Sequence, residues 1–223
     1  MFGCGVLALS FRRLAVCCRP LNYFYIHPRF RLAVAFFADR VDIINLLAHR
    51  GADLNAVHHP PPSSIVYHPP SGATPASHQI CLPNGCGALH AAVHAGRCRA
   101  IGALLELGAD PNCKDDSGLT PLILACRMPE AGYRLQMAKQ LLQGGSNPAL
   151  KCKQGAVALT YAAGLGDVEL IKLLAASAPA TLNHPQHWMM GHCVTPLTSA
   201  VMNNREAAVR ALLSLGASDK EGF

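Results

Sequence analysis

The chain has 223 residues, of which 51% are hydrophobic and only 14% are charged. This much apolar sequence can bury a substantial core, so the composition excludes a chain that is disordered along its whole length. The formal net charge of +6 would allow an acidic partner. However, the basic residues do not form the stripe, interleaved with aromatic side chains, that marks nucleic-acid-binding proteins, and we expect no nucleic-acid partner.

Cysteine usage and the N-terminal sequence indicate the compartment. The 10 cysteines are scattered and form no Cys-x-x-Cys pair. They are predicted to be reduced, buried thiols, which are typical of the cytoplasm or the nucleus. The apolar run 3–11 is too short to span a membrane, and it lacks the basic flank and the cleavage site of a signal peptide. We therefore expect no membrane partner.

Residues 1–29 allow two interpretations. Asn22 precedes Asn55 by one period of the repeat described below, which would make this segment a degenerate capping repeat. Pro20 and Pro28 would instead break it into a poorly ordered leader. The sequence leaves both interpretations open.

A helix over Val41–Arg50 is predicted to close the segment 30–56. An acidic residue, Asp42, stands near its N-terminal end, where the helix dipole favours a negative charge. Apolar residues at helical spacing predict its packing face, namely Ile43, Ile44, Leu46 and Leu47.

The segment 57–84 is predicted to be an inserted loop. It contains seven prolines, with serines and histidines between them. Proline at this density prevents helix formation and favours extended or disordered chain. We expect a long loop between two helical units.

The segment 85–118 contains the pattern that the rest of the chain repeats. From Gly85 to Asn112 it reads GCGALHAAVHAGRCRAIGALLELGADPN. Two short helices are predicted on either side of Gly96. Gly108 would close the second helix, because glycine adopts the left-handed conformation without steric cost.

Two signals of this pattern recur along the chain. The Thr-Pro-Leu sequences at Thr120 and Thr195 mark helix starts, since the threonine hydroxyl can cap a helix and proline suits its first position. Closing turns related to the Gly-Ala-Asp-x-Asn sequence of Gly108 recur before and after it, beginning at Gly51, Gly145, Ala178 and Gly216.

These signals divide the remaining chain into segments 119–151, 152–182, 183–194 and 195–223. In the first, four extra residues around Pro129 predict a longer turn between its two helices. In the second, Ala178 replaces the closing glycine, so that turn must form differently. The last helix, Glu206–Leu215, is more apolar than the solvent-facing end of a stack should be. This predicts either association through that end or a longer natural chain.

A period of about 33 residues with these openings and closing turns resembles the ankyrin repeat, in register from Leu32 to Ser218. The resemblance implies an all-α solenoid of helix-turn-helix units with finger loops. It also assigns His90 a structural role, bracing the turn of its own repeat. About five repeats are implied, over 30–56, 85–118, 119–151, 152–182 and 195–223, with insertions at 57–84 and 183–194.

The resemblance further implies a non-catalytic module, an ankyrin-like scaffold or adaptor, that binds a partner protein through its concave face and finger loops. By the same resemblance, Asn55 and Asn112 are candidate sites of asparagine hydroxylation. Carried over position by position, the candidate partner-binding residues are Phe37, His94, Lys114, Asp115, Asp116, Arg127, Met128, Lys151, Lys153, Leu165, Met202 and Asn203.

Catalytic motifs and metal ligands were weighed separately. No GxSxG, P-loop or HExxH motif occurs, so we expect no enzyme activity, no cofactor and no small-molecule substrate. One alternative function is a metal-responsive protein, because His184, His187 and His192 lie close in sequence and imidazole is a common zinc ligand. Pro185 interrupts this segment and argues against a shared ion. A second alternative is the targeting subunit of a larger enzyme complex.

Overall fold

The computed structural model describes residues 39–57, 85–187 and 193–218. Within these ranges the chain forms nine α-helices, one 3₁₀ helix (η1) and one pair of short strands. The elements are α3 (Val41–His49), α4 (Ala88–His94), α5 (Cys98–Glu106), α6 (Pro121–Arg127), α7 (Ala131–Gln143), α8 (Ala158–Leu165), α9 (Val168–Ser177), η1 (Pro179–Thr181), β1 (Gln186–His187), β2 (Cys193–Val194), α10 (Pro196–Met202) and α11 (Glu206–Ser214).

Some sequence predictions fall outside these ranges. They concern the segment 1–29, Phe37, almost all of the insertion 57–84, and His192. The first helix expected in 30–56 lies outside as well. The described residues do not test those predictions.

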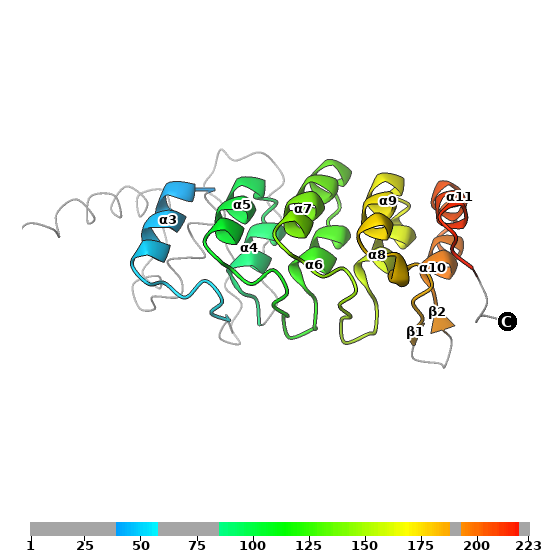
Figure 1. Ribbon diagram of the computed structural model, residues 1–223, viewed down its shortest axis with the longest axis horizontal. Helices are drawn as coiled ribbons and strands as arrows, with labels where there is room; N and C mark the ends of the chain where they lie inside the picture. Colours follow the sequence, from blue (N-terminus) through cyan, green and yellow to red (C-terminus); the bar gives the residue numbers. More distant parts are fainter. Residues whose placement is uncertain (1–38, 58–84, 188–192, 219–223) are drawn as a thin grey trace, which may run out of the picture.

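The helices form two layers that run along the stack (Figure 1). In the inner layer, α4, α6, α8 and α10 pack in succession; in the outer layer, α3, α5, α7, α9 and α11 do the same. The two helices of each pair also pack against each other, as α4 does on α5 and α10 does on α11. The loops between pairs extend from one side of the stack, at the bottom of Figure 1. The predicted all-α solenoid of helix pairs is confirmed.

Two inner helices begin where the Thr-Pro-Leu sequences predict. The Thr120 hydroxyl accepts a hydrogen bond from the Ile123 N–H at 3.3 Å at the start of α6. At the start of α10, the Thr195 hydroxyl accepts from the Thr198 N–H at 3.2 Å, and the Thr198 hydroxyl accepts from the Thr195 N–H at 2.7 Å. Such caps satisfy N–H groups that a helix start leaves without partners, and each stabilises by about 1 kcal/mol.

The closing glycines end the outer helices as predicted. The φ angle is +77° at Gly51, +86° at Gly108, +91° at Gly145 and +89° at Gly216, a region where a β-carbon causes strain. The N–H of the residue after each glycine bonds to the carbonyl five residues earlier, which is the Schellman pattern. At Ala178, where the glycine is missing, the chain turns into η1 instead.

The core lies between and within the two layers. Full burial of one leucine or isoleucine side chain stabilises a fold by about 1.5–3 kcal/mol. The largest enclosed side chains are Ile44, Leu89, Ile101, Leu104, Leu122, Ile123, Met137, Leu141, Leu159, Leu170 and Ile171.

A membrane-spanning helix is not found within the described ranges.

The packing face predicted for α3 is wrong at one position. Ile44 is enclosed, and Ile43 and Leu47 pack against the core, but Leu46 is 41% exposed. Two residues along a helix are separated by roughly 200° around its axis. Leu46 therefore points away from the side that buries Ile44.

The four extra residues of unit 119–151 lengthen a helix, so the predicted longer turn is wrong. Only Met128, Pro129 and Glu130 separate α6 from α7, and three residues also separate α4 from α5. Helix α7 has 13 residues, whereas α5 has 9. Proline disfavours helical geometry at the residue before it, and Met128 has an extended ψ of 142°, which ends α6.

The longer helix α7 carries a buried cation, Arg134. Its Nη1 donates to the Met128 carbonyl at 3.1 Å, and its Nε lies 3.3 Å from Oδ2 of Asp167. The two side chains are 9% and 13% exposed. Asp167 also caps α9, since its Oδ1 accepts from the Leu170 N–H at 3.2 Å. One buried ion pair therefore joins α7 to the start of α9.

The insertion 183–194 begins and ends as an antiparallel hairpin. Gln186 pairs with Val194 and His187 pairs with Cys193. Strand β2 packs against α10, and the hairpin extends from the same side of the stack as the other connecting loops (Figure 1).

Candidate interaction surface

The inner helices end along one edge of the stack, and the residues at these ends form the candidate surface. α4 ends at His94, α6 at Arg127, α8 at Leu165 and α10 at Met202. Because successive inner helices pack side by side, these ends follow one another from repeat to repeat. We call this row of four residues the inner edge.

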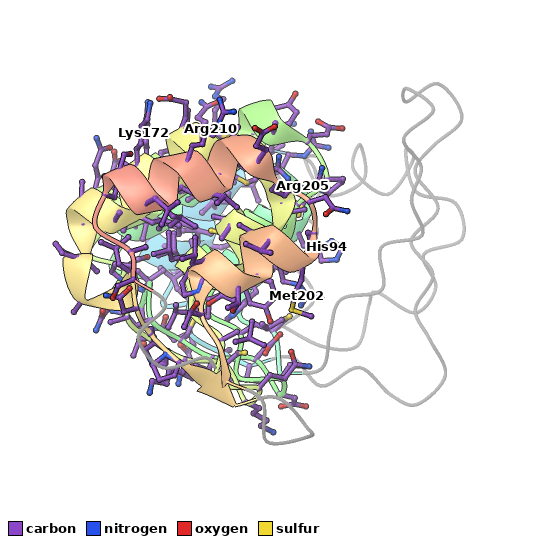
Figure 2. The ribbon with its side chains drawn as sticks, turned by 90° about the vertical axis from the view of Figure 1, so that its right-hand side faces the viewer. His94, Lys172, Met202, Arg205 and Arg210 are labelled. Atoms are coloured by element: carbon purple, nitrogen blue, oxygen red, sulfur yellow. The ribbon has the colours of Figure 1, made fainter. Side chains whose placement is uncertain are left out.

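Figure 2 looks along the stack from the side of α11 and separates the inner edge from the outer layer. His94 and Met202 lie on the side of α10. Lys172 of α9 and Arg210 of α11 lie on the side of the outer helices. The two pairs of residues thus belong to different faces of the stack.

The predicted surface residues differ in their exposure. Met202 is 71% exposed and Leu165 is 38% exposed, while Arg127 and Asn203 are also exposed. His94 is half-buried, and burial lowers its pKa below the usual value, which favours a neutral imidazole.

Met128 is in part a core residue. Its side chain is half-buried and packs against the hydrophobic core. The sequence pattern treated it as a surface position, because it follows the last residue of α6. Its truncation would therefore disturb packing as well as any contact with a partner.

Three exposed lysines lie on two neighbouring fingers, the segments 113–117 and 150–155. The Lys114 Nζ donates to the Lys151 carbonyl at 2.9 Å. The Lys153 N–H donates to the Ser117 carbonyl at 3.1 Å. The Lys114 ammonium of the first finger is therefore held against the backbone of the second finger, which carries Lys151 and Lys153.

Asp115 is buried, which corrects its prediction as a partner contact. It is 5% exposed, and its Oδ1 accepts from the Ser117 N–H at 2.9 Å and from the Leu119 N–H at 2.7 Å. Its carboxylate thus shapes the finger from inside, as aspartate side chains do in turns. The neighbouring Asp116 is exposed.

An aromatic side chain connects α6 to the second finger. The Arg127 guanidinium lies 5.5 Å from the centre of the Tyr161 ring, which is within the range of a cation–π contact. The Tyr161 hydroxyl donates to the Gln154 Oε1 at 3.4 Å and lies 3.7 Å from the Cys152 Sγ. Burial raises the pKa of Tyr161 to about 12, so the hydroxyl stays protonated at neutral pH.

His90 fastens its repeat to the next one, rather than bracing only its own turn as the resemblance implied. Its Nε2 lies 2.9 Å from the Leu119 carbonyl, immediately before the cap of α6. Since a carbonyl only accepts, Nε2 carries the proton, and Nδ1 is left to accept from the Cys113 thiol at 3.6 Å. Burial raises the pKa of Cys113 to about 12, which keeps this thiol protonated.

The stability of the fold is expected to fall as the pH drops below about 6.5, the ordinary histidine pKa. Burial lowers the pKa of His90, although the Leu119 carbonyl and the Asp115 charge oppose this shift. As the pH falls, His90 therefore binds a proton in the unfolded chain at a higher pH than in the folded chain. The stabilisation that neutral His90 contributes is fully present above the ordinary pKa, and it is lost as the pH falls from there towards the lowered pKa.

Urea unfolding at a series of pH values tests this expectation. His90→Gln should reduce stability at neutral pH but should also give a shallower decline towards acid pH. His49→Gln, at an exposed position of α3, should keep the slope of the unaltered chain. Equal slopes for His90→Gln and the unaltered chain would contradict the assignment.

A ladder of asparagine side chains joins successive closing turns. The Asn55 Oδ1 accepts from the Asp110 N–H at 2.9 Å, and the Asn112 Oδ1 accepts from the Asn147 N–H at 2.8 Å. The Asn183 Oδ1 likewise accepts a hydrogen bond from the Ser218 N–H at 2.9 Å. Sequence reasoning missed Asn183, because η1 shifts it away from the position that Asn55 and Asn112 hold in their turns.

Two of the three histidines considered for zinc lie within the described residues. His184 is half-buried, His187 belongs to β1, and His192 lies outside the described residues. Within the described part of the chain, no group of three or more His, Cys, Asp or Glu side chains could hold a metal ion.

Comparison with known families gives two matches. A family model described as ankyrin repeats (many copies) matches residues 81–128. A second, described as ankyrin repeats (3 copies), matches residues 130–221. Together they cover the described helices from α4 to α11.

Two curated proteins illustrate the similarity. The chain is 31% identical over 127 residues to the putative ankyrin repeat protein YahD of Escherichia coli, covering 53% of this chain and 57% of YahD. It is 37% identical over 101 residues to the ADP-ribosylation factor GTPase-activating protein AGD4 of Arabidopsis thaliana, covering 44% of this chain and 12% of AGD4. The activity in the second name describes a relative of which this chain spans a small part.

Proposed function

The chain belongs to the ankyrin repeat proteins, and from this premise we propose that it is a non-catalytic interaction module that binds a partner protein through its inner edge and fingers. One observation carries the proposal: exposed side chains continue along the inner edge across successive repeats, with Arg127, Leu165 and Met202 among them. Single exposed apolar residues are ordinary on protein surfaces. Arginine and methionine are enriched in the cores of protein interfaces, and an exposed leucine between them adds apolar area to the row.

The inner helices that carry this row are fixed by hydrogen bonds at their opposite, N-terminal ends, which supports binding. Thr120 and Thr195 cap the starts of two inner helices. His90 fastens one repeat to the next through the Leu119 carbonyl. A surface that is ordered before binding loses less conformational entropy when a partner docks.

Site-specific photo-cross-linking in cells tests the proposed surface. A benzoylphenylalanine side chain at Leu165 or at Met202 is expected to capture the same partner protein. The matched controls are Lys172 and Arg210, whose side chains are exposed on the outer layer. Capture from the controls as strong as from the inner positions would contradict the proposal, as would no capture from Leu165 and Met202.

Loss of affinity provides a second measurement once that partner is purified. Leu165→Ala with Met202→Ala should weaken binding about tenfold or more, since truncation of a hot-spot residue at the centre of an interface costs about 1 kcal/mol or more. Met128 is left unaltered, because it packs against the core. Lys172→Ala with Arg210→Ala should leave the affinity unchanged. Equal affinity of both double variants would argue against the inner edge.

We also propose that the module acts in the cytoplasm or the nucleus. Five cysteines of the described residues are free thiols: Cys86, Cys98, Cys113, Cys126 and Cys152. Cys86, Cys126 and Cys152 are buried, whereas Cys98 and Cys113 are partly buried. Free thiols in and around a core are typical of proteins from reducing compartments. Thiol labelling of the denatured cellular protein should modify all five. Protection from labelling that is lost on reduction would contradict the proposal.

A further inference from the structure

We propose that the partner presents an acidic segment, rich in aspartate or glutamate, to a basic surface formed by Lys114, Arg127, Lys151 and Lys153. This inference rests on the proposed function and specifies the chemistry of the partner. All four side chains are exposed.

The hydrogen bonds between the fingers gather three of these cations. The Lys114 ammonium donates to the Lys151 carbonyl at 2.9 Å, so a cation of one finger is fixed beside the next finger. The Lys153 N–H bonds to the Ser117 carbonyl at 3.1 Å, which aligns the two fingers. The positive charges of the three lysines are therefore gathered on one part of the protein surface.

Arg127 extends this region to the inner edge. Its guanidinium lies over the Tyr161 ring, and the Tyr161 hydroxyl contacts Cys152 and Gln154 of the finger that carries two of the lysines. A guanidinium that already rests on an aromatic face keeps its planar fork free for a carboxylate. The fingers and the end of α6 thus form one continuous surface.

Cations outnumber exposed carboxylates on this surface, because the first finger carries one exposed carboxylate, Asp116, and the second finger carries none. The segments 144–157 and 178–195, which follow α7 and α9 on the finger side, contain no aspartate or glutamate. Asp115 is buried and accepts backbone N–H bonds. Other carboxylates pair with cations away from this surface: Asp42 with Arg40, Asp167 with Arg134, Glu169 with Lys172 and Glu206 with Arg210.

The neighbouring apolar side chains favour a protein segment over a nucleic acid. Leu165 and Met202 continue the inner edge beyond Arg127 and are exposed. A peptide can place apolar side chains on them while its carboxylates meet the lysines. A phosphate backbone would use the cations alone, and the four cations do not form the long stripe that nucleic acids require.

Fluorescence anisotropy with the full chain tests the proposal. The probe is a fluorescein-labelled peptide of alternating glutamate and leucine, and its comparison is the same peptide with glutamine in place of glutamate. The acidic peptide should bind more tightly, and its affinity should fall as salt is added. Lys151→Glu with Lys153→Glu should weaken it about tenfold or more, because like charges then face each other.

The matched control is Lys139→Glu with Lys172→Glu, which changes the net charge equally at exposed positions of the outer helices α7 and α9. It should alter the affinity much less. An equal loss in the control, equal binding of the glutamine peptide, or tighter binding of a single-stranded DNA oligonucleotide would each overturn the proposal. Circular dichroism should show that both double variants remain folded.

Cross-linking separates a failure of this inference from a failure of the proposed function. If capture from Leu165 and Met202 persists in Lys151→Glu with Lys153→Glu at unchanged yield, the acidic partner is refuted while the interaction module stands. If the unaltered chain gives no capture from either position, the proposed function itself fails.

Discussion

Replacing Arg134 by methionine is expected to lower the free energy of unfolding by about 3 kcal/mol or more. Methionine keeps much of the length and the apolar stem of the side chain, but it leaves the Asp167 carboxylate, 13% exposed, without its cation. Removing one partner of a buried ion pair is more costly than removing both, because the remaining charge stays desolvated. Urea unfolding followed by circular dichroism measures the loss.

Two further variants separate the ion pair from packing. Arg134→Met with Asp167→Asn should recover a large part of the loss, since the asparagine oxygen can still cap α9 at Leu170. Lys172→Met removes an exposed pair with Glu169 and should cost about 0.5 kcal/mol or less. If Arg134→Met costs no more than Lys172→Met, the buried pair does not stabilise the junction of α7 with α9.

Replacing Val93 by asparagine is expected to lower the free energy of unfolding by about 3 to 5 kcal/mol, whereas the same change at Val201 should cost about 0.5 kcal/mol or less. Both residues stand six positions after the N-cap of an inner helix. Val93, Cys126 and Ala163 occupy this position in α4, α6 and α8 and are 0% exposed. Val201 of α10 is 56% exposed.

The comparison isolates burial, because helix propensity and position along the helix are the same at both sites. Thermal and urea unfolding at several protein concentrations provide the measurement. A large cost at Val201 that grows with protein concentration would mean that this end of the stack is covered in solution by another copy. A large cost at Val201 that is independent of concentration would contradict the exposure seen in α10.

Features that depend on a few neighbouring residues were predicted correctly from the sequence. Thr120 and Thr195 cap their helices through N–H groups three residues away. Gly108 and Gly145 take the left-handed conformation that the end of a helix favours. At Ala178 the sequence predicted that the turn must change, but not that it would become η1.

Contacts between repeats decided what the sequence did not. The extra residues of unit 119–151 entered α7, where Arg134 meets Asp167 of the next unit. His90 was recognised as structural, yet its partner Leu119 belongs to the following repeat. Asp115 was predicted to be exposed, because the pattern treats finger positions alike and does not show which side chain turns inwards.

The sequence by itself determined that this protein is a stack of helix pairs, because capping, glycine turns and apolar spacing act within one or two helical turns. Only the tertiary structure decided which members of the predicted surface are accessible. It buried Asp115, packed Met128 partly into the core and left Met202 exposed. It also brought Lys114 to the Lys151 carbonyl. Exposure and charge clustering depend on how successive repeats pack, and no local preference of the backbone encodes that packing.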